Sequence, residues 1–345
     1  MNLRSILGID HPILQAPLAG VQGSAMAIAV SNAGGLGALP CAMLSHAQLA
    51  AELEAIRRGT DRPYNLNFFC HTPPAPDPAV AQDWRARLRP YCVELGLDPD
   101  APPSGGGRAP FDHAIADLVE PYRPPVVSFH FGLPQPDLLE RVKGWGSYVL
   151  SSATTVDEAR WLVAHGVDAV IAQGLEAGGH RGMFLSDDLT TQVGTMALLP
   201  QIVRAVDVPV IATGGIATPE GVSAAFRLGA SAVQAGTAYL LADEATTSPL
   251  HRDAIRSHAA RHTALTNVFT GRPARGIMNR LMRELGPMNA QAPAFPLASV
   301  HVAALRSAAE ARGDAAFSPL WCGQDASACQ ARPAAEITAW LASGA

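Results

Sequence analysis

The stretch that decides the fold runs from residue 208 to residue 236 and reads VPVIATGGIATPEGVSAAFRLGASAVQAG. It opens with the β-prone run Val208–Thr213, continues with a helix predicted over Pro219–Leu228, and ends with the β-prone run Ala232–Gly236. Pro219 is typical of a first helical turn, because its missing N–H would have no partner there anyway. A strand, a crossover helix and a second apolar strand form the repeating unit of a parallel sheet.

The same unit recurs throughout the preceding 200 residues. Apolar runs without strict alternation are typical of parallel strands buried on both faces. Six further runs of this kind are Ile13–Leu18, Leu36–Pro40, Tyr64–Phe69, Pro125–His130, Tyr148–Ser152 and Asp168–Gln173. Helices are predicted over Ser45–Arg58 and over Thr155–His165, the second with Thr155 as its N-cap. Eight such runs predict an α/β protein with a (β/α)8 TIM barrel, and a doubly wound open sheet is the alternative.

We assign the barrel to residues 1–242. Two stretches are longer than the loops of a minimal barrel, one inside this range and one after it. Residues 71–124 contain the Pro/Gly-rich runs His71–Pro78 and Ala101–Pro110, which predict an irregular insertion. Residues 243–317 carry helical signals broken by glycine and proline, enough for a small, mainly helical lid domain over the barrel mouth. Residues 318–345 are then expected to pack back on the barrel.

Composition excludes several classes of protein. Of the 345 residues, 48% are apolar and 16% charged, which excludes a disordered chain. The net charge of -5 argues against nucleic acid as a partner. No uninterrupted apolar run is long enough for a membrane span, and the first residues lack the apolar core of a signal peptide, so we expect a cytoplasmic protein. The five scattered cysteines and the histidine spacing predict free thiols and no metal site.

Function in a parallel barrel lies at the carboxyl ends of the strands. Polar residues and glycines gather there at Gln15–Gly20, Asn65–Asn67, Ser128–Gly132, Gln173–Gly182, Ala212–Ile216 and Gln234–Thr237. Gly214, Gly215 and Gly236 would let backbone N–H groups approach a phosphate, and the helix starting near Pro219 would add a favourable dipole. Barrels commonly bind phosphate after their last two strands, although tight turns without a ligand are the alternative.

Two amides and two histidines are the candidates for chemistry. Asn67 and Gln173 end apolar strands, where buried amides need partners from either an isoalloxazine edge or the protein backbone. His180 stands in a Gly-Gly-His-Arg-Gly loop and could accept a carbon-bound proton or hold an anion at neutral pH. A solvated loop histidine is the alternative. His130 would either face the same barrel mouth or sit in the core.

Together these segments resemble the nitronate monooxygenases, formerly called 2-nitropropane dioxygenases, and in particular their class I branch. The resemblance rests on Gln15–Val21, Asn65–Phe69, Ser128–Pro134, Gln173–Gly182, Ala212–Ile216, Gln234–Thr237 and Phe317–Gln324. It implies a TIM barrel with non-covalently bound FMN. It also implies that O2 oxidises an alkyl nitronate, or a nitroalkane, to a carbonyl compound and nitrite.

The resemblance also implies roles for single residues. His180 matches the catalytic histidine, as base or anion-orienting residue, and His130 matches a second histidine that faces the substrate. The cofactor-binding residues that we predict are Gln15, Ala16, Pro17, Asn67, Gln173, Gly178, Gly179, Gly214, Gly215, Gln234, Ala235, Gly236 and Thr237. The expected partners are a small-molecule substrate and O2, and the expected assembly is a monomer or a homodimer.

The lid segment departs from the family pattern. That pattern typically reads Tyr-Pro-Leu-x-Tyr, followed four residues later by Lys, whereas this chain has Phe295, Ser299 and Ala303 at the three positions. If this segment is helical, these residues lie along one face of the helix, which would face the substrate pocket. Exchanging two tyrosine hydroxyls and a cation for a phenyl ring, one short hydroxyl and a methyl predicts a bulkier or less charged substrate, unless Arg306, or an arginine such as Arg275 or Arg280, replaces the cation.

Other functions fit the same barrel. The main alternative is an FMN-dependent oxidoreductase with a different substrate, for example an NAD(P)H-dependent enzyme similar to flavin enoyl reductases. A flavin-binding protein without turnover would have no need of His180 or His130. A barrel for another phosphate ligand would lack flavin colour.

Overall fold

A closed barrel of eight parallel strands forms the body of the protein. The computed structural model describes residues 3–102 and 108–345. Neighbouring strands follow the order β1-β9-β8-β6-β5-β4-β3-β2, and a parallel bridge between Leu14 and Leu36 closes the ring. The strands are β1 (Ile13–Gln15), β2 (Gly37–Pro40), β3 (Tyr64–Phe69), β4 (Val126–His130), β5 (Tyr148–Ala153), β6 (Ala169–Gln173), β8 (Val210–Thr213) and β9 (Ala232–Ala235). Each predicted run overlaps one of them, so the predicted barrel is confirmed and the open sheet is excluded.

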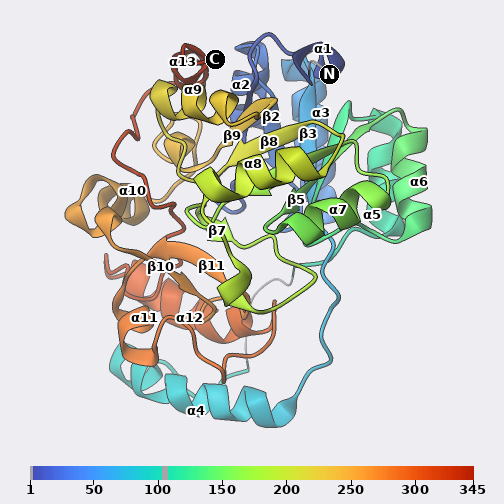
Figure 1. The fold of residues 1–345 in the computed structure, drawn as a ribbon. Coiled ribbons are helices and arrows are strands. Elements are labelled where there is room, and N and C mark those ends of the chain that lie inside the picture. The colour runs from blue at the N-terminus through green and yellow to red at the C-terminus, as the bar shows by residue number, and fades with distance from the viewer. Residues whose placement is uncertain (1–2, 103–107) are drawn as a thin grey trace.

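Helices cover the outside of the barrel (Figure 1). They are α2 (Ser24–Asn32), α3 (His46–Gly59), α5 (His113–Val119), α6 (Pro136–Gly144), α7 (Val156–Ala164), α8 (Thr195–Ala205), α9 (Pro219–Arg227) and α13 (Ala334–Ala342). A capping box between Ser45 and Gln48 starts α3, and the Thr155 side chain caps α7 as predicted. Pro219 opens α9, which follows the Gly214–Gly215 turn.

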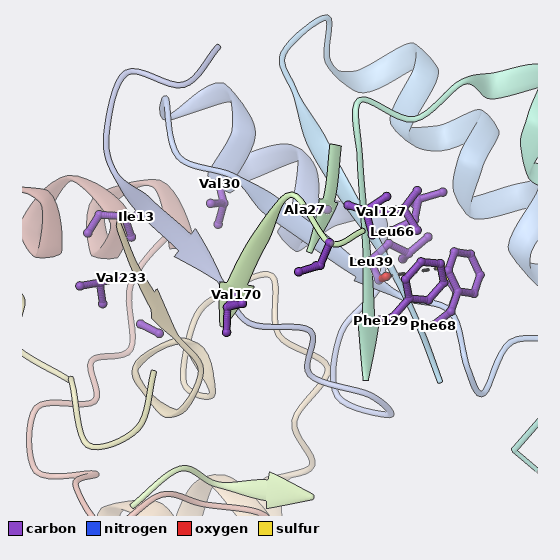
Figure 2. Packing of buried hydrophobic residues seen from close by; sticks show 14 of the residues in the cluster. Ile13, Ala27, Val30, Leu39, Leu66, Phe68, Val127, Phe129, Val170 and Val233 are labelled. Carbon is purple, nitrogen blue, oxygen red and sulfur yellow. Dashed lines mark hydrogen bonds between the residues drawn. The ribbon is translucent and has the colours of Figure 1, made fainter. Parts of the chain in front are cut away.

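The apolar core lies on both sides of the barrel wall. Outward-facing Ile13 and Val233 belong to the same cluster as Ala27 and Val30 of α2 (Figure 2). A second cluster joins Leu14 and other strand residues to α1 (Leu3–Leu7), which closes the amino-terminal end of the barrel. Because that end is filled, the space for a ligand lies at the carboxyl ends of the strands.

A second unit lies beyond those carboxyl ends (Figure 1). We call it the lid domain. Its antiparallel sheet has the order β10 (Thr263–Thr266), β11 (Ala274–Ile277), β7 (Gly179–His180). Its helices are α4 (Pro78–Leu95), α11 (Arg280–Leu285) and α12 (Ala298–Glu310), and α10 (Pro249–Arg256) leads into it from the barrel.

Short 3-10 helices occur along the whole described chain. They are η1 (Glu120–Tyr122), η2 (Leu189–Thr191), η3 (Thr237–Tyr239) and η4 (His258–Arg261).

The insertion over residues 71–124, which we expected to be irregular, contributes α4 to the lid domain. Asp77 caps this 18-residue helix, whose Trp84 and Leu88 share a core cluster with Leu305 of α12. Two prolines made this helix hard to predict. Pro78 stands in the first turn, where proline is tolerated, and Pro90 interrupts the helical sequence pattern inside the helix. Residues 103–107 of the predicted irregular run lie outside the described residues. In the part of the chain that is described, no helix has the length and apolar character to span a membrane.

Candidate active site

A cavity of about 310 Å³ opens at the carboxyl ends of the barrel strands. Side chains from successive strand ends line it, among them Asn67, Ser128, His130, Gln173 and Gln234. Residues 318–321 of the C-terminal segment also line it. The volume is at the small end of the range for cofactor and substrate pockets. Within residues 3–102 and 108–345, no cluster of three metal-ligating side chains occurs.

The predicted cofactor residues converge on this cavity, with two exceptions. Those that line it are Ala16, Pro17, Asn67, Gln173, Gly178, Gly179, Gly214, Gly215, Gln234, Gly236 and Thr237. Gln15 instead donates to the Gln22 side chain at 2.6 Å and accepts from the Ala38 N–H at 3.0 Å, which ties β1 to β2. Ala235 is buried in the barrel wall.

The glycine loops form one wall of the cavity. Gly214 and Gly215 have φ of 113° and 69°, in the left-handed region that favours glycine. A Cβ on Gly178 would come within 2.5 Å of the Gly323 nitrogen, so the C-terminal segment approaches here as closely as backbone allows. The Thr237 hydroxyl accepts from that same Gly323 N–H at 2.9 Å. Backbone is thereby brought to the cavity edge after both predicted phosphate-binding strands.

His180 is held by its backbone from both domains. It forms β7, where it pairs with Ala274 of β11 in the lid sheet. Its carbonyl accepts from Gln173 Nε2 at 3.0 Å and contacts His130 Nε2 at 3.2 Å. Gln173 Oε1 accepts from the Gly182 N–H at 2.7 Å, so the Gln173 amide spans the loop. These backbone bonds are one of the two kinds of partner that the sequence left open for Gln173, and the isoalloxazine edge stays a prediction.

His130 lies beside this loop as a neutral, fully engaged imidazole. Its Nε2 must donate to the His180 carbonyl, so its Nδ1 accepts from the Ser152 hydroxyl at 3.0 Å. Burial, the largest cause, lowers the pKa of His130 to about 3. The ring lines the cavity and also supports the position of His180.

The His180 ring faces the cavity within an aromatic shell. The ring centroids of Phe295 and Trp321 lie 5.3 and 5.5 Å from its own, and its Nε2 is 3.0 Å from the Thr270 hydroxyl. Burial above all, and then the charge of Arg108, lower the pKa of His180 well below its ordinary value. A neutral imidazole beside an open cavity can accept a proton.

Comparisons with known proteins agree over the whole chain. The sequence profile of the family described as nitronate monooxygenase matches residues 1–343. The chain belongs to the nitronate monooxygenase family. It is 40% identical to a nitronate monooxygenase of Paraburkholderia phytofirmans, over 98% of this chain and 93% of that protein. A second nitronate monooxygenase, from Pseudomonas aeruginosa, is 40% identical over 96% and 95% of the two chains.

A solved structure leads to the same family. The nitroalkane oxidase from Streptomyces ansochromogenes superimposes with a TM-score of 0.88 at 37% identity and covers 99% of this chain and 97% of its own. Nitronate monooxygenases are flavin-dependent oxidoreductases, so the chain is an enzyme, as the sequence predicted.

The three predicted lid residues do not lie along a single helical face as expected. Helix α12 starts at Ala298, so Phe295 precedes it; the Phe295 ring is buried, 4.8 Å from that of His71. Ser299 turns back to donate to the Pro296 carbonyl at 2.6 Å. None of Phe295, Ser299 and Ala303 lines the cavity. Of the three predicted substrate residues, Phe295 is thus the one that contacts the His180 ring.

Arginines from outside the motifs bring positive charge to this site. Arg108, from the insertion, lines the cavity with its guanidinium carbon 5.8 Å from the Phe295 ring centroid. Arg272 stacks at 4.1 Å on Phe131. Arg306 also lines the cavity, but it is paired with Glu310 at 2.7 Å. A cation therefore stands near the lid although position 303 is alanine.

Sequence reasoning missed several of these neighbours. Arg108 follows a glycine-rich run that gave no signal, and Thr270 and Arg272 reach the site through the fold alone. Phe131 and Trp321 had a signal, since they lie inside the Ser128–Pro134 and Phe317–Gln324 segments that carried the family resemblance.

Proposed function

We propose that this protein binds FMN non-covalently and uses O2 to oxidise an alkyl nitronate, or its parent nitroalkane, to a carbonyl compound and nitrite. The observation that carries the proposal is the neutral imidazole of His180, fixed at a cavity whose opposite edge is a glycine-lined cradle. Family membership supports the same reaction class.

The residues present fit an FMN molecule. Gly179 has no atom within 4 Å of the position of a Cβ, so its backbone borders open cavity space where a phosphate could approach. Gly214, Gly215 and Gly236 border the same cavity, and α9 begins shortly after them. Asn67 donates from Nδ2 to the Ser128 hydroxyl at 2.9 Å, which leaves its Oδ1 to accept from a flavin ring N–H. FMN, when bound, supplies the electron transfer from substrate to O2.

His180 would handle the proton. With a neutral nitroalkane, the imidazole takes the proton from the carbon next to the nitro group. The electron pair of the broken C–H bond moves onto the nitro group and produces the nitronate. With a preformed nitronate this step is absent. The nearby charges of Arg108 and Arg272 then favour the anion in the cavity.

The decisive experiment follows the flavin spectrum after anaerobic mixing of the purified protein with a panel of nitronates. We expect bleaching by at least one nitronate, nitrite release once air is admitted, and a yellow monophosphate released by heat. Bleaching by NADH but by no nitronate would favour the reductase alternative. Absence of flavin after reconstitution with FMN would refute both.

A further inference from the structure

The ring of His180 is held by a residue of the lid domain that no motif marked. Thr270 lies between β10 and β11, 1% exposed, and does not line the cavity. Its Oγ1 is 3.0 Å from His180 Nε2 and donates to the carbonyl of Arg272 at 3.3 Å. One hydroxyl therefore stands between a ring nitrogen and a backbone acceptor.

Counting protons decides the direction of this chain of hydrogen bonds. A hydroxyl has a single proton to donate, and the Arg272 carbonyl can only accept. When Thr270 donates to that carbonyl, its oxygen must accept from His180, so the imidazole proton is on Nε2. No hydrogen bond reaches His180 Nδ1 among the described residues, so the remaining lone pair is available to the cavity.

We propose that Thr270 is a positioning residue that fixes His180 in the Nε2–H tautomer and thereby makes Nδ1 the proton acceptor. The catalytic meaning of this assignment rests on the proposed function, but the tautomer does not. The opposite tautomer would turn the cavity-facing nitrogen into a donor, unable to take a proton from carbon.

The surrounding backbone keeps the two partners in register. His180 pairs with Ala274, and the Arg181 N–H donates to the Pro273 carbonyl at 2.8 Å, so His180 lies on a paired strand and Thr270 lies in the loop that leads into the other strand of that pair. On the other side of Thr270, the Gly271 N–H donates to the Asn267 carbonyl at 2.7 Å. A Cβ on Gly271 would come within 2.1 Å of the Pro293 carbonyl oxygen, so this turn has no room to shift. The lid sheet therefore positions the His180 backbone and ring together.

The tautomer can be measured directly. In the holoenzyme labelled with 15N-histidine, nitrogen shifts distinguish protonated from unprotonated ring nitrogens, and His180→Asn identifies the signals of His180. We expect a protonated Nε2 in the wild type and in Thr270→Ser, and a mixture or the reverse tautomer in Thr270→Val. An Nδ1–H tautomer in the wild type overturns the proposal, whether or not any variant folds.

Kinetics test the consequence. We expect Thr270→Val to lower kcat with a neutral nitroalkane by roughly 10-fold, the scale of one lost hydrogen bond, and to change turnover of the preformed nitronate far less. Thr270→Ser should restore kcat. Thr247→Val is the matched control, because it removes another buried hydroxyl, one that has no partner among the described residues.

The two proposals fail differently. A tautomer and kcat that are unchanged in Thr270→Val overturn the role of Thr270. A wild type with protonated Nε2 that oxidises no nitro compound instead overturns the proposed function and leaves the tautomer assignment standing.

Discussion

Arg108 gives the clearest test of how substrates are recognised at this site. It lines the cavity and forms no ion pair with any described residue, unlike Arg306, which is bound to Glu310. Burial and the charge of Arg306 lower the pKa of Arg108, but a guanidinium starting from 12.5 stays charged at neutral pH. An unpaired, partly desolvated cation next to Phe295 is suited to an acidic group on the substrate tail.

We therefore predict that Arg108→Gln weakens the use of a nitronate that also carries a carboxylate, such as propionate 3-nitronate. A charge-assisted hydrogen bond contributes about 1.5–3 kcal/mol, which corresponds to a loss in kcat/KM of roughly 10- to 150-fold. A nitronate with a plain alkyl tail lacks the second contact and should lose far less. The assay compares kcat/KM for the two substrates in wild type and variant.

The double variant Arg306→Gln/Glu310→Gln is the matched control for this prediction. It removes a cation from the same cavity together with the carboxylate that pairs with it and also lines the cavity, so the net charge is unchanged and we expect a change of less than about threefold. Equal losses for both substrates in Arg108→Gln would mean that Arg108 acts on the nitronate group or on folding. A wild type that discriminates against the carboxylated substrate would instead support the less charged substrate expected from the lid sequence.

Four further predictions concern the histidines, the glycine cradle and a buried carboxylate. His180→Asn should retain flavin but lose about 10²–10⁴-fold in turnover of a neutral nitroalkane; near-wild-type turnover would remove His180 from the mechanism. Gly215→Val should raise the Kd for FMN in a titration of apoprotein, because a β-branched residue is strained at a φ of 69°; an unchanged Kd would exclude this loop from the phosphate site. Glu158 accepts from the N–H groups of Thr154 and Phe184, each at 2.6 Å, so Glu158→Gln should lower the free energy of unfolding in urea by about 3 kcal/mol, and a change below about 1 kcal/mol would contradict this. Burial lowers the pKa of His71 to about 4, so His71 alone should make the free energy of unfolding fall by up to about 1.4 kcal/mol per unit as the pH drops from about 6.5 towards 4; His71→Phe should reduce the measured slope, and an identical slope would be evidence against a neutral His71.

The barrel could be predicted because its signals are local. Each strand run, the Thr155 cap and the Pro219 start are readable within a few residues, and the glycines after β8 and β9 fall where a barrel puts phosphate. Helix α4 was missed for an equally local reason, since its prolines imitate a loop. Its partner α12 lies more than 200 residues further along the chain, and no sequence signal near α4 indicates that contact.

The site could be predicted only as far as the strand ends reach. Glycines and amides at those ends converge on one cavity, but the direction of each amide depends on competition between backbone partners. The Gln15 amide bonds to the backbone at the β1–β2 junction, and the Gln173 amide bonds to the backbone of the His180 loop. Arg108 and Thr270 come from the lid domain, and their positions depend on tertiary packing that no sequence pattern encodes.

In the proposed mechanism, the two domains would act on different parts of the chemistry. The glycines after β8 and β9 belong to the barrel, where both strands are fixed by parallel neighbours on both sides. His180 lies in the chain between two barrel strands, yet its strand β7, which also contains Gly179, pairs with β11 at the edge of the lid sheet. Thr270, Phe295 and Trp321 next to its ring also come from beyond the barrel. We therefore expect a change in lid packing to alter the position of the proposed proton acceptor and the Gly179 side of the cradle, while the glycines after β8 and β9 stay as they are.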